Sequence, residues 1–203
     1  MDTFILIGIT GIGLGALYFL VASGLSLIYG LMGVLNFAHG SFLTVGAFVG
    51  YWIATKLGPE TSMVDFVIAM IVGGLAAGLF ALAMEQLLIT RLYERHIDQA
   101  LVTVGVSLVV GAVLAGWFGN DLIMFPTPMW FLTAINVGGA MIPADRVVYI
   151  ATAVLLLIGN WILLKYTRIG LIIRAGVENR NMVNALGINV RRAFSTVFFL
   201  GGF

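Results

Sequence analysis

The feature that most constrains this chain is an uncharged run from residue 3 to residue 55. About 20 apolar residues cross the hydrocarbon core of a bilayer as a helix. The run is more than twice that length, so it predicts two membrane-spanning helices. Three glycines, Asn36 and His39 interrupt it at 30–40. Because polar groups inside a membrane protein usually serve a polar substrate or a deliberate break in a helix, we expect this segment to matter for function.

The composition excludes a water-soluble domain. Hydrophobic residues make up 61% of the chain and charged residues 9%, with a mean hydropathy of +1.11, whereas soluble domains carry roughly 25% charged residues. The net charge of +1 predicts no nucleic-acid partner. The chain has no cysteine, which excludes disulfides and thiolate chemistry. Its first residues lack the positive segment of a cleaved signal peptide, so we expect the first span to be retained.

Further apolar runs follow the first two predicted spans. They lie at 66–89, 100–118, 147–164 and 193–203. The last run is about half as long as a span requires, so the sequence predicts a partial chain that stops inside a helix. We therefore expect an all-α, polytopic transmembrane helical bundle, a single domain over residues 1–203 with about five spans and a truncated sixth. Pro126 and Pro128 predict a structured loop, rather than a helix, at 119–146.

Charge sorts the connecting loops into two groups. The loops at 90–99 and 165–192 hold most of the lysines and arginines, whereas the loops at 56–65 and 119–146 hold only Lys56 and Arg146. Because positively charged loops stay on the cytoplasmic side, the first pair is predicted to be cytoplasmic and the second pair external. Two crossings before Lys56 would place the N-terminus outside. A re-entrant segment among them would place it inside.

Catalytic and metal-binding motifs are missing from the sequence. It has two distant histidines, no HExxH pattern, no nucleophile elbow and no glycine-rich phosphate loop. We therefore expect no enzyme activity, no bound metal and no cofactor in this chain.

Small and polar residues within the spans predict close helix packing. Thr103 and Ser107 share one helix face and are expected to pack or to hydrogen-bond across helices. Glu85 and Arg91 are expected to be interface anchors or a local ion pair. Glycines four apart, which predict either helix packing or the wall of a substrate path, are Gly11 and Gly15, Gly46 and Gly50, and Gly74 and Gly78.

Asn36 and His39 lie three residues apart and would share a face if both lay on one helix. Two interpretations are open. Together with Gly40 they line the substrate path or its gate, or they satisfy each other and nearby carbonyl groups at a helix end.

The segment 165–192 contains the signals of a short helix. Asn179 is a good N-cap for 180–186, and Gly187 fits the position after its C-terminal end. A helix this short is marginal on its own, so we expect a docking partner. The residues of its apolar face are Met182, Val183, Leu186 and Ile188. This face suits either a groove on another protein or the lipid headgroups.

Three blocks of sequence, in this order, resemble the permeases of branched-chain amino acid ABC transporters. They are LMGVLNFAHGS at 31–41, RLYERHIDQALVTVGVSL at 91–108 and GLIIRAGVENRNMVNALGIN at 170–189. Leu92 replaces a proline that is usual in the second block. The resemblance runs from about residue 14 to residue 203. Members of the family continue after this point with further spans, including a glycine-rich block.

The resemblance implies a permease subunit of an ATP-driven importer for branched-chain or related small amino acids, working by alternating access in the bacterial inner membrane. Implied partners are cytoplasmic ATP-binding subunits that hydrolyse the ATP, an identical or related second permease subunit, an outer substrate-binding protein and the lipid bilayer. The residues implied to meet the ATP-binding subunits are Arg174, Glu178, Asn179, Met182, Ala185, Leu186, Gly187 and Ile188. Alternatives are a urea or amide permease and, in another class, a passive channel or secondary transporter, which should carry intramembrane acids or broken-helix ion sites.

The cytoplasmic assignment of 165–192 is testable because the chain has no cysteine. A single cysteine introduced by Asn181→Cys should resist an impermeant thiol reagent added outside intact cells and should react once the membrane is permeabilised. Ser62→Cys lies in the loop at 56–65, which is predicted to be external, and should be labelled from outside. Ready labelling of Asn181→Cys in intact cells would reject the assignment.

Overall fold

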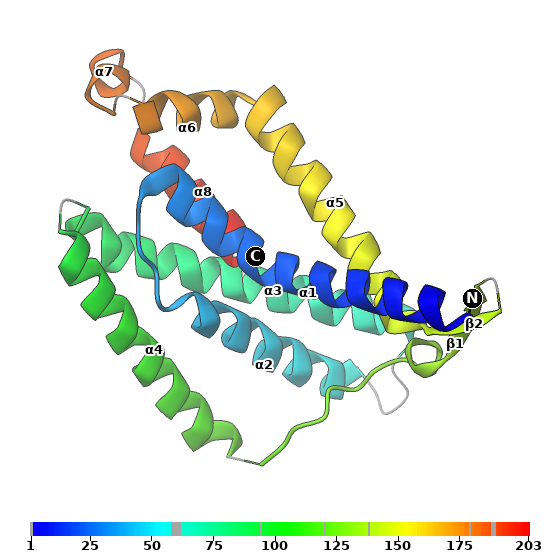
Figure 1. Ribbon diagram of the computed structural model, residues 1–203. Helices are drawn as coiled ribbons and strands as arrows, with labels where there is room; N and C mark the ends of the chain where they lie inside the picture. Colours follow the sequence, from blue (N-terminus) through cyan, green and yellow to red (C-terminus); the bar gives the residue numbers. More distant parts are fainter. Residues whose placement is uncertain are drawn as a thin grey trace.

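The computed structural model describes residues 2–57, 62–93, 95–119, 121–137, 139–178, 180–187 and 190–203. Helices make up most of this part of the chain, as the sequence predicts (Figure 1). In chain order the elements are α1 (Asp2–Met32), α2 (His39–Leu57), α3 (Met63–Leu87), the 3-10 helix η1 (Ile89–Arg91), α4 (His96–Phe118), the 3-10 helix η2 (Met129–Leu132), β1 (Ala134–Val137), β2 (Ala140–Pro143), α5 (Ala144–Tyr166), α6 (Arg168–Glu178), α7 (Arg180–Ala185) and α8 (Val190–Gly202).

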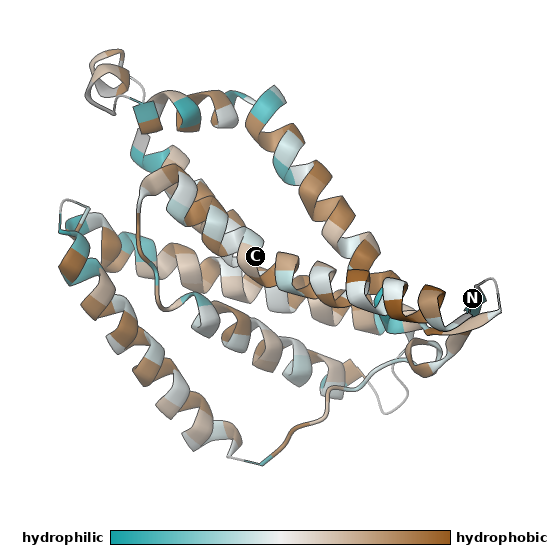
Figure 2. Ribbon diagram, in the orientation of Figure 1, coloured by the Kyte–Doolittle hydropathy of each residue, from teal (hydrophilic) through white to brown (hydrophobic). Residues whose placement is uncertain are grey.

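Within the described residues, four helical segments are long and apolar enough to cross a membrane. They are Thr3–Met32, Met63–Arg91, His96–Phe118 and Ala144–Tyr166. The uncharged run does form two helices, α1 and α2, but only α1 belongs to that set, so the prediction that both span the membrane is not confirmed. The described residues hold four such segments, where the sequence predicts about five and a truncated sixth. Hydrophobic residues cover the outer sides of α4 and α5, while hydrophilic residues gather near the helix ends (Figure 2). The chain is a polytopic helical membrane protein.

α3 lies between α2 and α8 and packs closely against both. A methyl group added at Gly73 would come within 2.5 Å of the carbonyl oxygen of Gly46 in α2, and one added at Gly78 within 2.9 Å of the carbonyl oxygen of Phe199 in α8. Small residues let membrane helices approach until their backbones touch. Two of the predicted glycine pairs therefore serve helix packing. A methyl group added at Gly11 or Gly15, by contrast, would meet no atom of another element within 4 Å among the described residues.

A short β-hairpin interrupts the helical pattern before α5. β1 and β2 pair antiparallel, with Ala134 opposite Pro143 and Val137 opposite Ala140. The prolines at 126 and 128 do keep this region out of a long helix, as predicted. The hairpin itself was not predicted. It contacts α1 near the N-terminus, and Figure 1 shows the N-terminus and the hairpin together at one end of the bundle.

The two basic loops meet at the opposite end, which we call the basic end. There Val183 of α7 and Phe194 of α8 are buried against Tyr93, which follows η1, and against Met32 at the end of α1. One end of the bundle thus holds the end of α1, the η1 connection, α6 and α7 (Figure 1). This grouping agrees with the prediction that 90–99 and 165–192 lie on the same side of the membrane.

The close contact of α2 and α3 predicts a stability effect that depends on position. Gly73→Ala should destabilise the protein by about 1–3 kcal/mol, because its methyl group meets backbone rather than a flexible side chain. Gly111→Ala in α4 is the matched control, since no atom lies within 4 Å of the added methyl group. Thermal unfolding in detergent measures both. Equal melting temperatures for Gly73→Ala and wild type would show that α2 and α3 do not touch at this point.

Candidate transport path and coupling segment

The break between α1 and α2 is an ordered stretch of non-helical backbone. The N–H of Gly33 donates to the carbonyl of Tyr29 at 2.8 Å, and the positive φ of Gly33, 64°, turns the chain out of α1. The Asn36 side-chain oxygen then accepts from the N–H of Ala38 at 3.0 Å. Thr103 of α4 accepts from the N–H of Phe37 at 3.1 Å. The backbone groups freed by the break are thereby partly paired within the protein, as a membrane requires.

Asn36 does not share a helix face with His39. Asn36 precedes α2, and its side chain folds back on the start of that helix, whereas His39 is the first helical residue. The geometry of Asn36 is that of a side chain satisfying backbone groups at a helix end. Thr103 does not make a hydrogen bond to another helix: its oxygen accepts from the backbone of the break, and its hydroxyl donates to the carbonyl of Ala100 in its own helix at 3.0 Å.

His39 is buried deep in the bundle, with 7% of its surface exposed. Its Nε2 lies 3.1 Å from the carbonyl oxygen of Val21 in α1. Because a carbonyl only accepts, Nε2 carries the proton in this contact. Val21 lies about 16 Å before the end of α1 at the usual helical rise, so α2 begins well inside the bundle. Within the described residues, His39 Nδ1 has no hydrogen-bond partner.

His39 lines a cavity of about 420 Å³ between α1, α2, α5 and α8. Most of its wall is aliphatic, and its polar side chains are His39, Ser23 and Asn160. The lining residues are Leu20, Val21, Ser23, Gly24, Leu27, His39, Leu43, Leu155, Leu156, Gly159, Asn160, Leu163, Leu200, Gly201, Gly202 and Phe203.

Of the three residues predicted for a substrate path, only His39 lines this cavity. Asn36 is buried outside its lining, and Gly40 is exposed. Asn160 and Ser23 were not predicted. The signal for Asn160 is present in the sequence, because it is an amide in the middle of the apolar run at 147–164. Ser23 gives no such signal, because a serine in an apolar helix can satisfy its hydroxyl within that helix. In the structure the Ser23 hydroxyl indeed donates to the carbonyl of Leu20.

The cavity lies beside the closest contact between α1 and α8. The backbone of Gly24 meets that of Gly201, and a methyl group added at Gly24 would also come within 2.8 Å of the His39 ring. A methyl group at Gly201 would come within 2.8 Å of Ile28. Sliding or separation of these two helices would therefore change the shape of the cavity directly.

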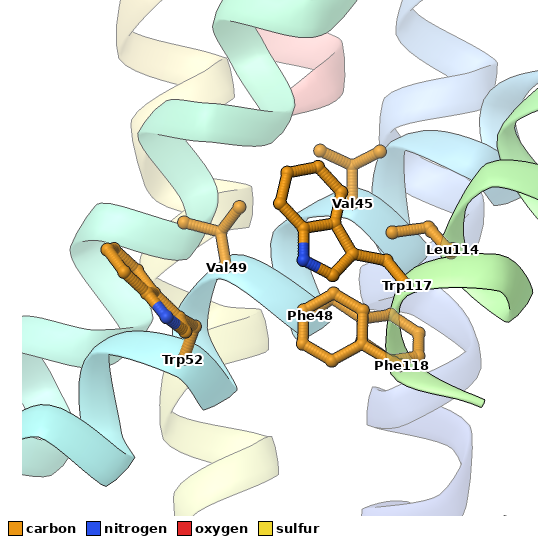
Figure 3. Close-up of a pocket in the computed structure, with 7 residues that line it drawn as sticks. All are labelled: Val45, Phe48, Val49, Trp52, Leu114, Trp117 and Phe118. Carbon is orange, nitrogen blue, oxygen red and sulfur yellow. The ribbon is translucent and has the colours of Figure 1, made fainter.

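A second hollow of about 360 Å³ lies between α2 and α4 (Figure 3). The side chains that line it are Val45, Phe48, Val49, Trp52, Leu114, Trp117 and Phe118. The Phe48 and Phe118 rings approach to 4.5 Å between centroids. The two indole nitrogens are the only polar side-chain atoms in this lining, so its side chains offer a substrate two N–H donors but no acceptor and no charge. Trp52 and Trp117 lie near the ends of their helices, as interfacial aromatics do.

The predicted short helix is α7, and its apolar face is divided between two environments. Leu186 is 68% exposed, whereas Val183 is buried against Phe194. Val183 therefore faces neither of the two environments expected for this face, a partner's groove or the lipid headgroups, because its side chain packs α7 onto its own bundle. Gly187 has a positive φ of 76°, as predicted for the residue after the helix. Asn179 and Ile188 lie outside the described residues.

The other residues of the predicted coupling segment lie at the surface of the basic end. Arg174 and Glu178 are exposed on α6, and Met182, Ala185 and Gly187 are exposed on or just after α7. α6 and α7 thus present these side chains next to one another while Val183 anchors the segment.

Glu85 corrects another prediction. It is neither an interface anchor nor the partner of Arg91, because its side chain is fully buried and Arg91 is exposed. Its carboxylate instead accepts from the hydroxyls of Thr90, at 3.1 Å, Tyr93, at 2.6 Å, and Ser195, at 2.7 Å.

Comparison with known proteins shows which protein family the chain resembles. Residues 7–203 match the family model described as "Branched-chain amino acid transport system / permease component". The chain is 26% identical to the permease protein LivH of the high-affinity branched-chain amino acid transport system of Salmonella typhimurium and 27% identical to that of Escherichia coli. Each alignment covers 94% of this chain and 64% of the relative. The probable branched-chain amino acid permease LivH of Methanocaldococcus jannaschii is 29% identical, over 90% of this chain and 58% of its own length.

No solved structure matches the chain significantly. The chain spans 64% of the length of the enterobacterial relatives. Because the family model covers almost the whole chain, from residue 7 to residue 203, this protein belongs to the family of permease components of branched-chain amino acid transport systems.

Proposed function

We propose that this protein is the membrane-spanning permease subunit of an ATP-driven importer for branched-chain or related small amino acids. The observation that carries the proposal is the cavity between α1, α2, α5 and α8, found in a chain of this family. Its volume of about 420 Å³ is within the range of small-molecule sites.

The chemistry of the cavity wall fits an aliphatic amino acid. The leucines of the wall suit an aliphatic side chain, because they offer no competing polar contact. The polar ends of the substrate require hydrogen bonds, which Ser23, His39 and Asn160 can supply. α2 begins at His39, so the positive end of its helix dipole lies at the cavity wall and favours a carboxylate there.

The energy for transport comes, in this proposal, from separate ATP-binding subunits at the basic end. The sequence has no phosphate-binding loop of its own. α7 and the exposed residues beside it form the contact with those subunits, and ATP-dependent closure selects one of two permease conformations. A second permease subunit, identical or related, completes the path, and an outer binding protein delivers substrate at the hairpin end. Coupling of this kind requires each partner to bind one conformation more tightly than the other.

The proposal is tested with the complete transporter that contains this chain, purified and reconstituted in lipid vesicles. Labelled leucine should enter the vesicles only with the binding protein outside and ATP inside. Urea, tested in the same way, distinguishes an amide permease. Import that continues without ATP would assign the chain to a passive channel or a secondary transporter instead.

The position of His39 in the cavity predicts an effect on transport. His39→Ala removes a polar group from the wall and should lower uptake about fivefold or more, while the complex still assembles. His96→Ala is the matched control, because His96 is exposed at the start of α4. Initial uptake rates and co-purification of the subunits measure both effects. Wild-type uptake by His39→Ala would leave His39 with a purely structural role.

The divided face of α7 predicts opposite phenotypes for two neighbouring residues. Leu186→Asp should weaken binding of the ATP-binding subunits by on the order of 2 kcal/mol, because it places a charge in a desolvated contact. Val183→Asp should instead lower the melting temperature, because Val183 is buried within the chain. Leu122→Asp, at another highly exposed leucine, is the control for added charge and should change neither quantity. Normal ATPase binding and transport by Leu186→Asp would favour the lipid-surface interpretation of α7.

A further inference from the structure

A buried carboxylate joins α3 to α8 at the basic end. We call Glu85, Thr90, Tyr93 and Ser195 the Glu85 clasp. Tyr93 and Thr90 donate to one carboxylate oxygen and Ser195 to the other, and Ser195 lies 110 residues further along the chain. Thr90 also donates to the backbone carbonyl of Glu85 at 2.9 Å. Both side-chain oxygens of Glu85 are thus held by hydroxyl groups.

This arrangement is costly for a membrane protein. A buried carboxylate is normally paired with a cation, yet the ion pairs within the described residues are Arg95 with Asp98 and Arg146 with Asp145. Three hydroxyl donors take the place of a cation at Glu85. A packed apolar side chain would often be as stable. The carboxylate, however, holds α3, the η1 connection and α8 together through hydrogen bonds of fixed direction. An apolar contact would not fix their relative positions in this way.

The donors of the clasp lie beside the contact that holds α7. Tyr93 is itself part of the cluster that buries Val183, and its ring lies 6.2 Å from that of Phe194. Phe194, which directly precedes Ser195, is buried in the same cluster, which Met32 and Ala175 complete. A displacement of α7 therefore acts on Tyr93, whose hydroxyl donates to Glu85. It also acts on Phe194, whose neighbour in α8, Ser195, is the other donor to Glu85.

α8 connects the clasp to the cavity. Ser195 lies near its start, whereas Gly201, Gly202 and Phe203 at its far end line the cavity around His39. Between them α8 packs on α3, where Phe199 lies against Gly78. It also packs on α1, both at the glycine crossing of Gly24 with Gly201 and in the hydrophobic clusters that Met32 and Ile28 share with residues of α8. α8 is thus fixed to α3 at several points, and its crossing with α1 at Gly201 lies at the cavity.

We propose that the Glu85 clasp makes α3 and α8 move as one body, so that displacement of α7 by an ATP-binding subunit reshapes the cavity at the crossing of α1 and α8. Glu85, Tyr93 and Ser195 are positioning residues in this proposal, since none of them lines the cavity. The inference rests on the proposed function of α7 as the contact with the ATP-binding subunits.

The test measures transport and ATP hydrolysis together in the reconstituted complete transporter. Tyr93→Phe and Ser195→Ala each remove one hydroxyl and keep the rest of the side chain's contact. Each should lower the number of amino acids imported per ATP hydrolysed by about fivefold or more, while the complex still assembles and hydrolyses ATP. Thr196→Ala is the matched control, because the Thr196 hydroxyl donates within its own helix to the carbonyl of Arg192 at 3.0 Å. It should leave the ratio unchanged.

Two outcomes of this assay would overturn the proposal. One is an unchanged ratio in both Tyr93→Phe and Ser195→Ala. The other is an equal loss of transport and hydrolysis together with a lower melting temperature, which would give the clasp a role in folding alone. If the wild-type complex hydrolyses ATP without importing an amino acid, the proposed function fails. That result comes from the wild type alone, so it can be distinguished from a failure of the clasp proposal, which is read from the variants.

A second measurement needs no variant of the clasp. Spin labels on cysteines at Leu87 in α3 and Arg191 in α8, both exposed, report the distance between the two helices near the clasp. This distance should stay constant between the nucleotide-free and ATP-bound transporter. The distance from a label at Arg191 to one at Tyr18, exposed on α1, should change. A change between Leu87 and Arg191 would show that α3 and α8 move separately and would overturn the proposal even if the variants failed to assemble.

Discussion

The structure depends on pairing the backbone at the break between α1 and α2. Inside a bilayer no water is available for a free N–H or carbonyl, so non-helical backbone must find partners within the protein. The turn at Gly33, the side chain of Asn36 and the hydroxyl of Thr103 supply them. Because the chain can leave α1 and run back along the bundle in this way, α2 begins deep inside the protein. His39 is thereby placed against α1 and at the wall of the cavity.

Close glycine contacts then decide how the helices surround that cavity. At Gly46 and Gly73 the backbones of α2 and α3 touch, and at Gly24 and Gly201 those of α1 and α8 touch. Dispersion forces and packing drive such association where lipid is as apolar as the side chains. The same contacts limit what can move. α3 is joined closely to α2 and α8. The crossing of α1 with α8 lies at the cavity wall, where a change in the packing of these two helices would alter the shape of the cavity.

The polar groups of the bundle divide by depth and by role. His39, Ser23 and Asn160 face the cavity, where a small polar ligand could use them. Glu85 lies at the basic end, fully buried and held by the nearby hydroxyls of Thr90 and Tyr93 and by that of Ser195, which is 110 residues away. α8 spans the interval between these two sites. A permease that works by alternating access needs such a connection between its ATP-binding partners and its substrate path.

The sequence alone determined the membrane class, the break near 30–40 and the grouping of the basic loops, because length, hydropathy and charge act locally. It also predicted that Gly187 follows the short helix α7, since the left-handed conformation after a helix favours glycine. Only the tertiary structure decided that His39, but not Gly40, lines the cavity, and that Val183 turns inward while Leu186 stays exposed. The role of Glu85 depends on Ser195, 110 residues away. No local pattern encodes that partner, because its position is set by how α3 and α8 pack.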